Sequence, residues 1–465
     1  MLWTLLILIP VLIVNQEMVV RLGAITRVGH ARLIFERFGK FWGAFSVIDL
    51  FILNFLTIVT EFIGFSMALN YFGVSPLISV PIGVAGLIAI TVTGSFRRWE
   101  SVMWVCCLAS LVMIPFALIP HPAIGPIVHD TFIPSITGGL NSTALLTIIA
   151  IVGTTVAPWQ LFFQQSNVVD KRITARWVKH ERTDTIVGSF LTNIEAGGLI
   201  IAAAFVFVGT KFFGAFTDAG TTAQGYAQLG HPAMGVILMI VLLNASIIGA
   251  CAVSLSTSYA FGDVFKVNHS LHRKVSEAKL FYGSYAALVV LAGAIVLIPN
   301  APLGLLTFAV QALAGILLPS ATVFLVLLCN DREVLGPWVN KPWLNAVAAV
   351  IVGLLVVLSL ILAATTLFPN LDAIKMAAVL GSILFLSLVV MGVVGLVQRI
   401  HKGQGPEREA LAHIEKETWQ MPPLAELTRP TWSVTRKIGM FTLRAYLFIA
   451  VILLVVKTVQ LAIGR

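Results

Sequence analysis

The chain has 465 residues, of which 58% are hydrophobic and only 11% are charged, and its formal net charge is +9. Soluble proteins carry roughly 25% charged residues, so this composition excludes a soluble globular protein and indicates a polytopic membrane protein. The positive charge would suggest nucleic-acid binding in a soluble protein, but in a membrane protein it reflects basic cytoplasmic loops. The four cysteines lie in or beside apolar segments without metal-ligand or disulfide spacing.

Apolar runs long enough to cross a bilayer predict an all-α protein with about twelve transmembrane helices. In chain order the runs occupy residues 2–22, 44–72, 76–94, 100–120, 143–168, 185–210, 233–264, 276–298, 303–329, 343–367, 374–399 and 438–461.

The basic residues predict the orientation of these helices. If residue 1 lies outside, all 30 Lys and Arg residues fall at inner ends or in inner loops except Lys211, Lys375, Lys457 and Arg465. We therefore expect an integral protein of the plasma (inner) membrane, with its basic loops in the cytoplasm. The basic run at 173–182 is expected to contact anionic membrane lipid, and we predict neither nucleic acid nor an obligate protein partner.

The run at 143–168 contains a proline at mid-depth. Pro158 removes a helical N–H and crowds the carbonyl of Thr154, and carbonyls released in this way must face protein, water or a bound cation. Polar side chains follow the proline. We therefore predict a broken helix that lines a site, with a plain proline kink as the alternative. The residues assigned to the break and its vestibule are Gly153, Thr155, Pro158, Trp159, Gln160 and Gln164.

Four motifs occur in a characteristic order along the chain. They are residues 21–26 (RLGAIT), 60–64 (TEFIG), 153–159 (GTTVAPW) and 310–313 (VQAL) followed by Pro319. This pattern resembles the Nramp divalent-metal transporters, and more closely their magnesium-transporting branch, over roughly residues 1–365. The resemblance implies a LeuT-type fold of two inverted five-helix repeats, whose broken helices meet at an ion site near the middle of the bilayer.

The resemblance also implies the domain organisation. The family's first helix, with its Asp-Pro-Gly-Asn motif, has no counterpart here. We expect one of two explanations. Either the start codon was chosen too far downstream, so that a further helix belongs before residue 1, or the chain is a degenerate paralogue. The expected parts are an incomplete first repeat at 1–120, an outer loop at 121–142, a second repeat at 143–329 with its break at 153–160, further helices at 343–399, a cytoplasmic linker at 400–436 and a final helix at 437–465.

The resemblance implies ligands at the break. Ala157 stands where the family has a methionine, whose thioether suits soft ions; without it, oxygen ligands favour Mg²⁺ or Mn²⁺. The implied metal ligands are the carbonyls of Thr154 and Ala157 and the side chain of Gln311. For Gln311, an interhelical hydrogen bond is an equally good interpretation.

The resemblance further bears on proton coupling. Trp159 and Gln164 replace two family histidines, so the usual proton acceptors beside the ion are absent. Glu61 remains at the family's proton-release position; we rank a role beside the cation's ligands above a proton relay or a protonated structural glutamate. Asn193 and Glu195 are predicted either to line the inner vestibule or to pack helices together.

The sequence therefore predicts a transporter of divalent metal cations, weakly coupled or uncoupled to protons and without a cofactor. A LeuT-fold carrier of amino acids or organic cations, and a non-transporting truncated paralogue, are the alternatives. An enzyme is not expected, because the sequence contains no metal-binding cluster, Ser-His pair or glycine-rich phosphate loop.

Overall fold

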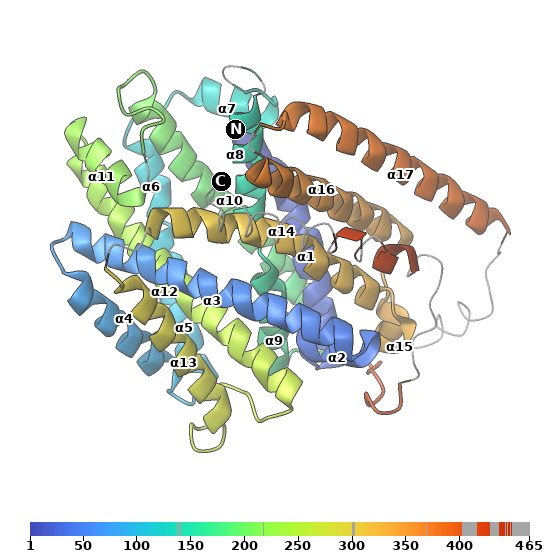
Figure 1. Ribbon diagram of the computed structural model, residues 1–465. Helices are drawn as coiled ribbons and strands as arrows, with labels where there is room; N and C mark the ends of the chain where they lie inside the picture. Colours follow the sequence, from blue (N-terminus) through green and yellow to red (C-terminus); the bar gives the residue numbers. More distant parts are fainter. Residues whose placement is uncertain are drawn as a thin grey trace. The chain divides into compact units, whose positions relative to one another are not determined.

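Figure 1 shows the computed structural model, in which the described residues form helices and connecting segments without β-strands. The structure describes residues 1–401 except 137, 138, 140, 217, 300–302 and 369, then 416–427, and 437–448 except 442, 444 and 447. These residues form two compact units.

The first unit comprises Met1–Ile9, Val47–Ser135 and Ile186–Val310. It contains most of α3 (Lys40–Tyr71), α4 (Pro76–Thr91), α5 (Phe96–Ser110), α6 (Met113–Leu118), α7 (Ile124–Phe132), most of α10 (Val178–Phe207), α11 (Ala219–Gln228), α12 (Pro232–Phe265) and α13 (Lys279–Val296). The expected outer loop at 121–142 thus includes a short helix, α7.

The second unit comprises Pro10–Ser46, Ile136–Thr185 and Gln311–Arg465. It contains most of α1 (Leu2–Thr26), α2 (His30–Phe38), α8 (Ser142–Thr155), α9 (Pro158–Asp170), η1 (Ala175–Trp177), most of α14 (Leu303–Cys329), α15 (Arg332–Leu335), η2 (Gly336–Trp338), α16 (Pro342–Leu367) and α17 (Ala373–His401).

The described helices match the hydropathy of the sequence. Nine of them are long and apolar enough to cross a membrane, a tenth span is the pair Leu313–Cys329 and Arg332–Trp338 bent by 66°, and Pro76–Thr91 is apolar but shorter. Together they cover every expected span except that at 438–461, most of which lies outside the described residues, as do 402–415 and 428–436 of the linker. The prediction of an all-α polytopic membrane protein is confirmed.

In the first unit, α3 and α12 pack closely and antiparallel. A Cβ added at Gly64 would lie 2.5 Å from the Ser246 hydroxyl oxygen. Further along, Asn54 Nδ2 donates to the Thr257 hydroxyl at 2.9 Å. Residues with lower numbers on α3 contact residues with higher numbers on α12, as expected for antiparallel helices. The small side chains at these contacts allow the helices to approach closely.

In the second unit, α16 and α17 form a hairpin beside α8 (Figure 1). Leu145 and Ile149 of α8 share an apolar cluster with Ile361 and Leu362 of α16 and with Ala373 at the start of α17. This packing supports the first half of α8.

Candidate functional site: a helix broken at a proline

The expected break lies between α8 and α9. The Val156 N–H still donates to the Val152 carbonyl at 3.3 Å, after which Val156 and Ala157 are extended and a new helix begins at Pro158. The local sequence explains the break: the residue before a proline is disfavoured in helical conformation, whereas proline is favoured at the first position of a helix. A single proline therefore ends one helix and begins the next.

The break leaves backbone carbonyls without helical donors. In a continuous helix the Ala157 N–H would bind the Gly153 carbonyl, but it donates to Gln160 Oε1 at 3.2 Å. Pro158 has no N–H to offer the Thr154 carbonyl. The Ala157 carbonyl, in contrast, already accepts the Gln160 N–H at 3.2 Å. The Gly153 and Thr154 carbonyls are thus among the oxygens that the break releases.

The side chains at the break have definite partners. Gln160, which we expected in the vestibule, instead caps α9 with its amide oxygen. The hydroxyls of Thr154 and Thr155 both donate to the Ile151 carbonyl, at 3.1 and 2.7 Å. The residues closest to Pro158 therefore have mainly backbone oxygens to offer a ligand.

Gly153 lies directly against α14. A Cβ at this position would be 3.2 Å from the Gly315 Cα and 3.9 Å from the Gln311 carbonyl oxygen. Only a residue without a side chain allows this backbone-to-backbone approach. The contact brings two predicted site residues, Gly153 and Gln311, into one local arrangement within the second unit.

Buried amide atoms without hydrogen-bond partners occur on α9 and on α1 among the described residues. Gln164 Oε1 and Asn167 Oδ1 have no hydrogen-bond partner among the described residues. The same holds for both amide atoms of Asn15, a buried residue of α1. α1 contacts α9 where a Cβ at Gly23, eight residues after Asn15, would lie 3.1 Å from the Gln165 carbonyl oxygen.

Asn15 was missed by the sequence reasoning. The available signal was a lone asparagine within the apolar run 2–22. Burying an unpaired amide is unfavourable by roughly 1–3 kcal/mol, so such groups are typical of positions that bind water or a ligand. Gln164 and Asn167, three residues apart, present unpaired oxygens on one side of the helix that follows the break.

The segment that leads into α2 is tied to α9. His30 Nδ1 lies 2.7 Å from Gln165 Oε1, and Gln165 Nε2 donates to the Val28 carbonyl at 2.7 Å. The His30 ring also packs edge-on against Phe162. Burial lowers the pKa of His30 from 6.5 to about 4, although its hydrogen bond to Gln165 opposes this. His30 is therefore neutral at physiological pH.

This buried histidine predicts a loss of stability in mild acid. Between pH 6.5 and 4 the unfolded chain binds a proton at His30 and the folded chain does not, so the free energy of unfolding should fall by about 3 kcal/mol over that range. Thermal unfolding of the detergent-solubilised protein from pH 7 to 4 measures this slope. His30→Gln should flatten it, whereas replacing the exposed His121 should not; equal slopes for all three proteins would contradict the assignment.

Three predicted residues belong to the first unit. Glu61 belongs to α3 and contacts α12, where a Cβ at Gly249 would be 2.3 Å from Glu61 Oε1, so the glycine makes room for the carboxylate. Asn193 Nδ2 donates to the Ser189 carbonyl of its own helix at 2.8 Å. Glu195 accepts the Ser110 hydroxyl at 2.6 Å and thereby links α10 to α5, which agrees with the helix-packing interpretation.

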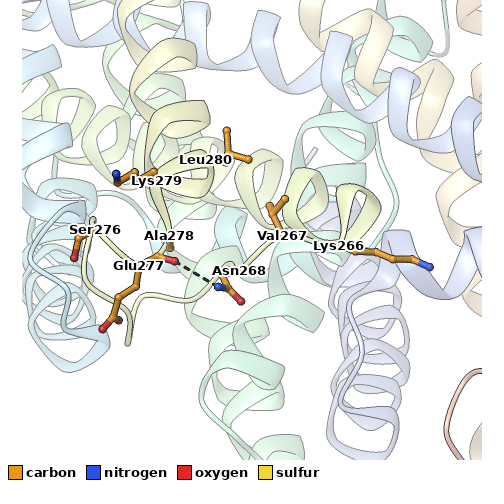
Figure 2. A pocket seen from close by; sticks show the side chains of 8 residues that line it. All are labelled: Lys266, Val267, Asn268, Ser276, Glu277, Ala278, Lys279 and Leu280. Atoms are coloured by element: carbon orange, nitrogen blue, oxygen red, sulfur yellow. Dashed lines mark hydrogen bonds between the residues drawn. The ribbon is translucent and has the colours of Figure 1, made fainter.

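No group of three or more His, Cys, Asp or Glu side chains in the described parts of the chain is arranged to hold a metal ion. An open hollow of about 510 Å³ between α12 and α13 is lined by Lys266, Lys279 and Glu277 among others (Figure 2). Its two lysines would repel a cation.

The fold and the broken helix define a class of protein: a polytopic helical membrane transporter with LeuT-type architecture. More specifically, the chain belongs to the Nramp family, because the family profile described as natural resistance-associated macrophage protein-like matches residues 1–365. This match confirms membership of the Nramp family, as inferred from the motifs, and makes the protein a transporter rather than an enzyme.

Individual relatives support this assignment. The chain is 26% identical over 370 residues to the divalent metal cation transporter MntH of Lacticaseibacillus casei, covering 76% of this chain and 79% of the relative. It is 25% identical over 374 residues to the MntH protein of Staphylococcus saprophyticus, covering 75% and 80%. Its fold is similar to that of an Eremococcus coleocola manganese transporter, with a TM-score of 0.61, 18% identity and 88% of each chain covered.

Proposed function

We propose that this protein transports divalent metal cations across the plasma membrane and that the ion binds at the break between α8 and α9. The observation that carries the proposal is the loss of helical donors for the Gly153 and Thr154 carbonyls, beside the helix that bears Gln311. Relatives of the chain named as divalent metal cation transporters, and a structural neighbour named as a manganese transporter, support the same substrate class.

The chemistry of these oxygens favours hard ions. Carbonyl, amide and water oxygens suit Mg²⁺ and Mn²⁺, whereas soft ions prefer sulfur. The Thr154 carbonyl and the Gln311 side chain are the principal ligands in this proposal. The Ala157 carbonyl is a weaker candidate because it accepts the Gln160 N–H. Ala157 itself offers no sulfur, so Mg²⁺ and Mn²⁺ should be transported in preference to Cd²⁺.

Transport is driven by the membrane potential, with weak or no proton coupling. An inward divalent ion gains about 4.6 kcal/mol per 100 mV, twice the value for a single charge, so accumulation needs no proton. Trp159 and Gln164 cannot titrate near neutral pH. Glu61 is not an obligatory proton relay in this proposal.

Uptake into proteoliposomes tests this function. Vesicles with the full-length protein should accumulate Mn²⁺ and Mg²⁺ under an inside-negative potential without stoichiometric acidification of their interior. Pro158→Ala restores a donor for the Thr154 carbonyl and should reduce uptake at least about tenfold, which corresponds to a loss of 1.4 kcal/mol in binding. Pro342→Ala, at the equivalent first position of α16, is the matched control and should leave uptake unchanged.

Two results would argue against the proposal. The transport function is excluded if vesicles with the wild-type protein take up no more Mg²⁺, Mn²⁺ or Cd²⁺ than protein-free vesicles. The uncoupled mechanism alone is excluded if one or more protons enter with each cation.

A further inference from the structure

A second proline lies in the helix that faces the break. Pro319 is inside α14, and its ring leaves the carbonyl four residues earlier, that of Gly315, without its helical donor. In a membrane helix such a carbonyl requires a donor from elsewhere in the protein. The structure supplies this donor through a hydroxyl group of α16, and a hydroxyl group from a second distant segment binds the next carbonyl.

Ser359 and Tyr446 bind neighbouring carbonyls at this kink. The Ser359 hydroxyl of α16 donates to the Gly315 carbonyl at 2.5 Å. The Tyr446 hydroxyl donates to the Ile316 carbonyl and lies 3.0 Å from Ser359 Oγ. Both side chains are almost fully buried, with exposed fractions of 2% for Ser359 and 3% for Tyr446. The two hydroxyls therefore form one connected group on the α14 backbone.

Tyr446 belongs to the segment 437–448, whose described residues are helical. Met440 and Leu443 precede Tyr446 at three-residue intervals, which places all three on one face of a helix, and all three are buried. A Cβ at Gly439 would lie 3.6 Å from Leu327 of α14. Segment 437–448 thus packs along α14.

The kink and the broken helix share a residue. Gly315, which accepts the Ser359 hydroxyl, is also the residue against which Gly153 of α8 packs. Gln311 lies one helical turn before Gly315, on the same side of α14. A shift of the α14 backbone at Gly315 would consequently move both Gln311 and the last turn of α8.

We propose that Ser359 and Tyr446 are positioning residues for cation transport: by holding the Gly315 and Ile316 carbonyls, they maintain the spacing between Gln311 and the released carbonyls of α8. This inference rests on the proposed function, and it assigns the C-terminal segment 437–448 to the transport machinery. If the hydroxyls only satisfied buried carbonyls, their loss would change stability but not the affinity for the transported ion.

The test measures Mn²⁺ uptake by the full-length protein in proteoliposomes as a function of Mn²⁺ concentration. Tyr446→Phe and Ser359→Ala should each raise KM by about two- to tenfold, the range for a net hydrogen bond of 0.5–1.5 kcal/mol, with a smaller effect on the maximal rate. Ser359→Thr retains the hydroxyl and should restore the wild-type KM. The control is Ser382→Ala on the exposed part of α17, where the hydroxyl donates only to Ala378 of its own helix, and it should change nothing.

A double variant tests the link to the proline. Pro319→Ala returns an N–H to the Gly315 carbonyl. Ser359→Ala should therefore change KM less in the Pro319→Ala background than in the wild-type protein. An undiminished effect in the Pro319→Ala background would overturn the proposal. So would variants whose unfolding temperature falls while KM stays at the wild-type value.

The outcomes separate this inference from the proposed function. A wild-type protein that takes up no divalent ion would refute the proposed function, and the inference with it. A wild-type protein that transports Mn²⁺, together with Tyr446→Phe and Ser359→Ala variants of unchanged KM, would refute the inference alone.

Discussion

Replacing Ala157 with methionine is expected to raise the ratio of Cd²⁺ to Mg²⁺ uptake at least about tenfold, a change of 1.4 kcal/mol in relative affinity. Ala157 is the last residue before Pro158, and its backbone is extended, with φ −110° and ψ 147°, a conformation that methionine also adopts. The new thioether would lie beside the oxygens released by the break. Sulfur binds Cd²⁺ in preference to Mg²⁺ because sulfur and Cd²⁺ are both soft, whereas Mg²⁺ is hard.

The control for this experiment is Ala157→Leu, which adds similar bulk without sulfur. Leucine is expected to reduce uptake of all ions alike, because Ala157 is only 6% exposed and a larger side chain would overpack this buried position. Separate measurements of Cd²⁺ uptake and Mg²⁺ uptake into the same proteoliposomes give the ratio. If methionine and leucine have the same effect, the ion does not pass close to residue 157.

Replacing Arg37 with methionine should lower the free energy of unfolding by roughly 3–5 kcal/mol, the usual effect of leaving one partner of a buried ion pair uncompensated. Arg37 of α2 donates through Nε and Nη2 to Asp331 Oδ2, at 2.9 and 2.7 Å. The side chains are only 2% and 5% exposed. The other oxygen of Asp331 caps α15, so the loss would also affect the start of that helix.

Measurements of unfolding also distinguish the buried Arg37–Asp331 ion pair from an exposed ion pair. Lys375 and Asp372 are both exposed, and Lys375→Met should leave the unfolding temperature in detergent unchanged. Adding Asp331→Asn to Arg37→Met removes the buried charge and should restore part of the lost stability. An Arg37→Met protein as stable as the wild type would show that water reaches this pair.

Much of the architecture follows from local properties of the sequence. Hydropathy alone predicts the apolar spans, because each needs about 20 apolar residues whatever its neighbours are. The break at Pro158 is equally local, since the missing N–H and the restricted preceding residue act within one turn. The motifs around Glu61, Pro158 and Gln311 were sufficient for the resemblance to the Nramp family.

The composition of the candidate site could be predicted only in part. Gly153, Thr154 and Pro158 were identified because the proline acts on residues close to it. The role of Gln160 was not, since an amide at this position can point into a vestibule or cap its own helix, and the choice depends on the exact backbone geometry. Asn15 was missed because nothing in the apolar run around it indicates which helix it faces.

By itself, then, the sequence determined that this is a helical membrane protein of the Nramp family with a span broken at Pro158, because apolar length and proline geometry operate over short stretches of chain. Only the tertiary structure decided that Gly153 rests on Gly315 and that Ser359 and Tyr446 hold the adjacent carbonyls. These partners lie far apart in the chain, and their pairing depends on how whole helices pack, which no local pattern of residues specifies.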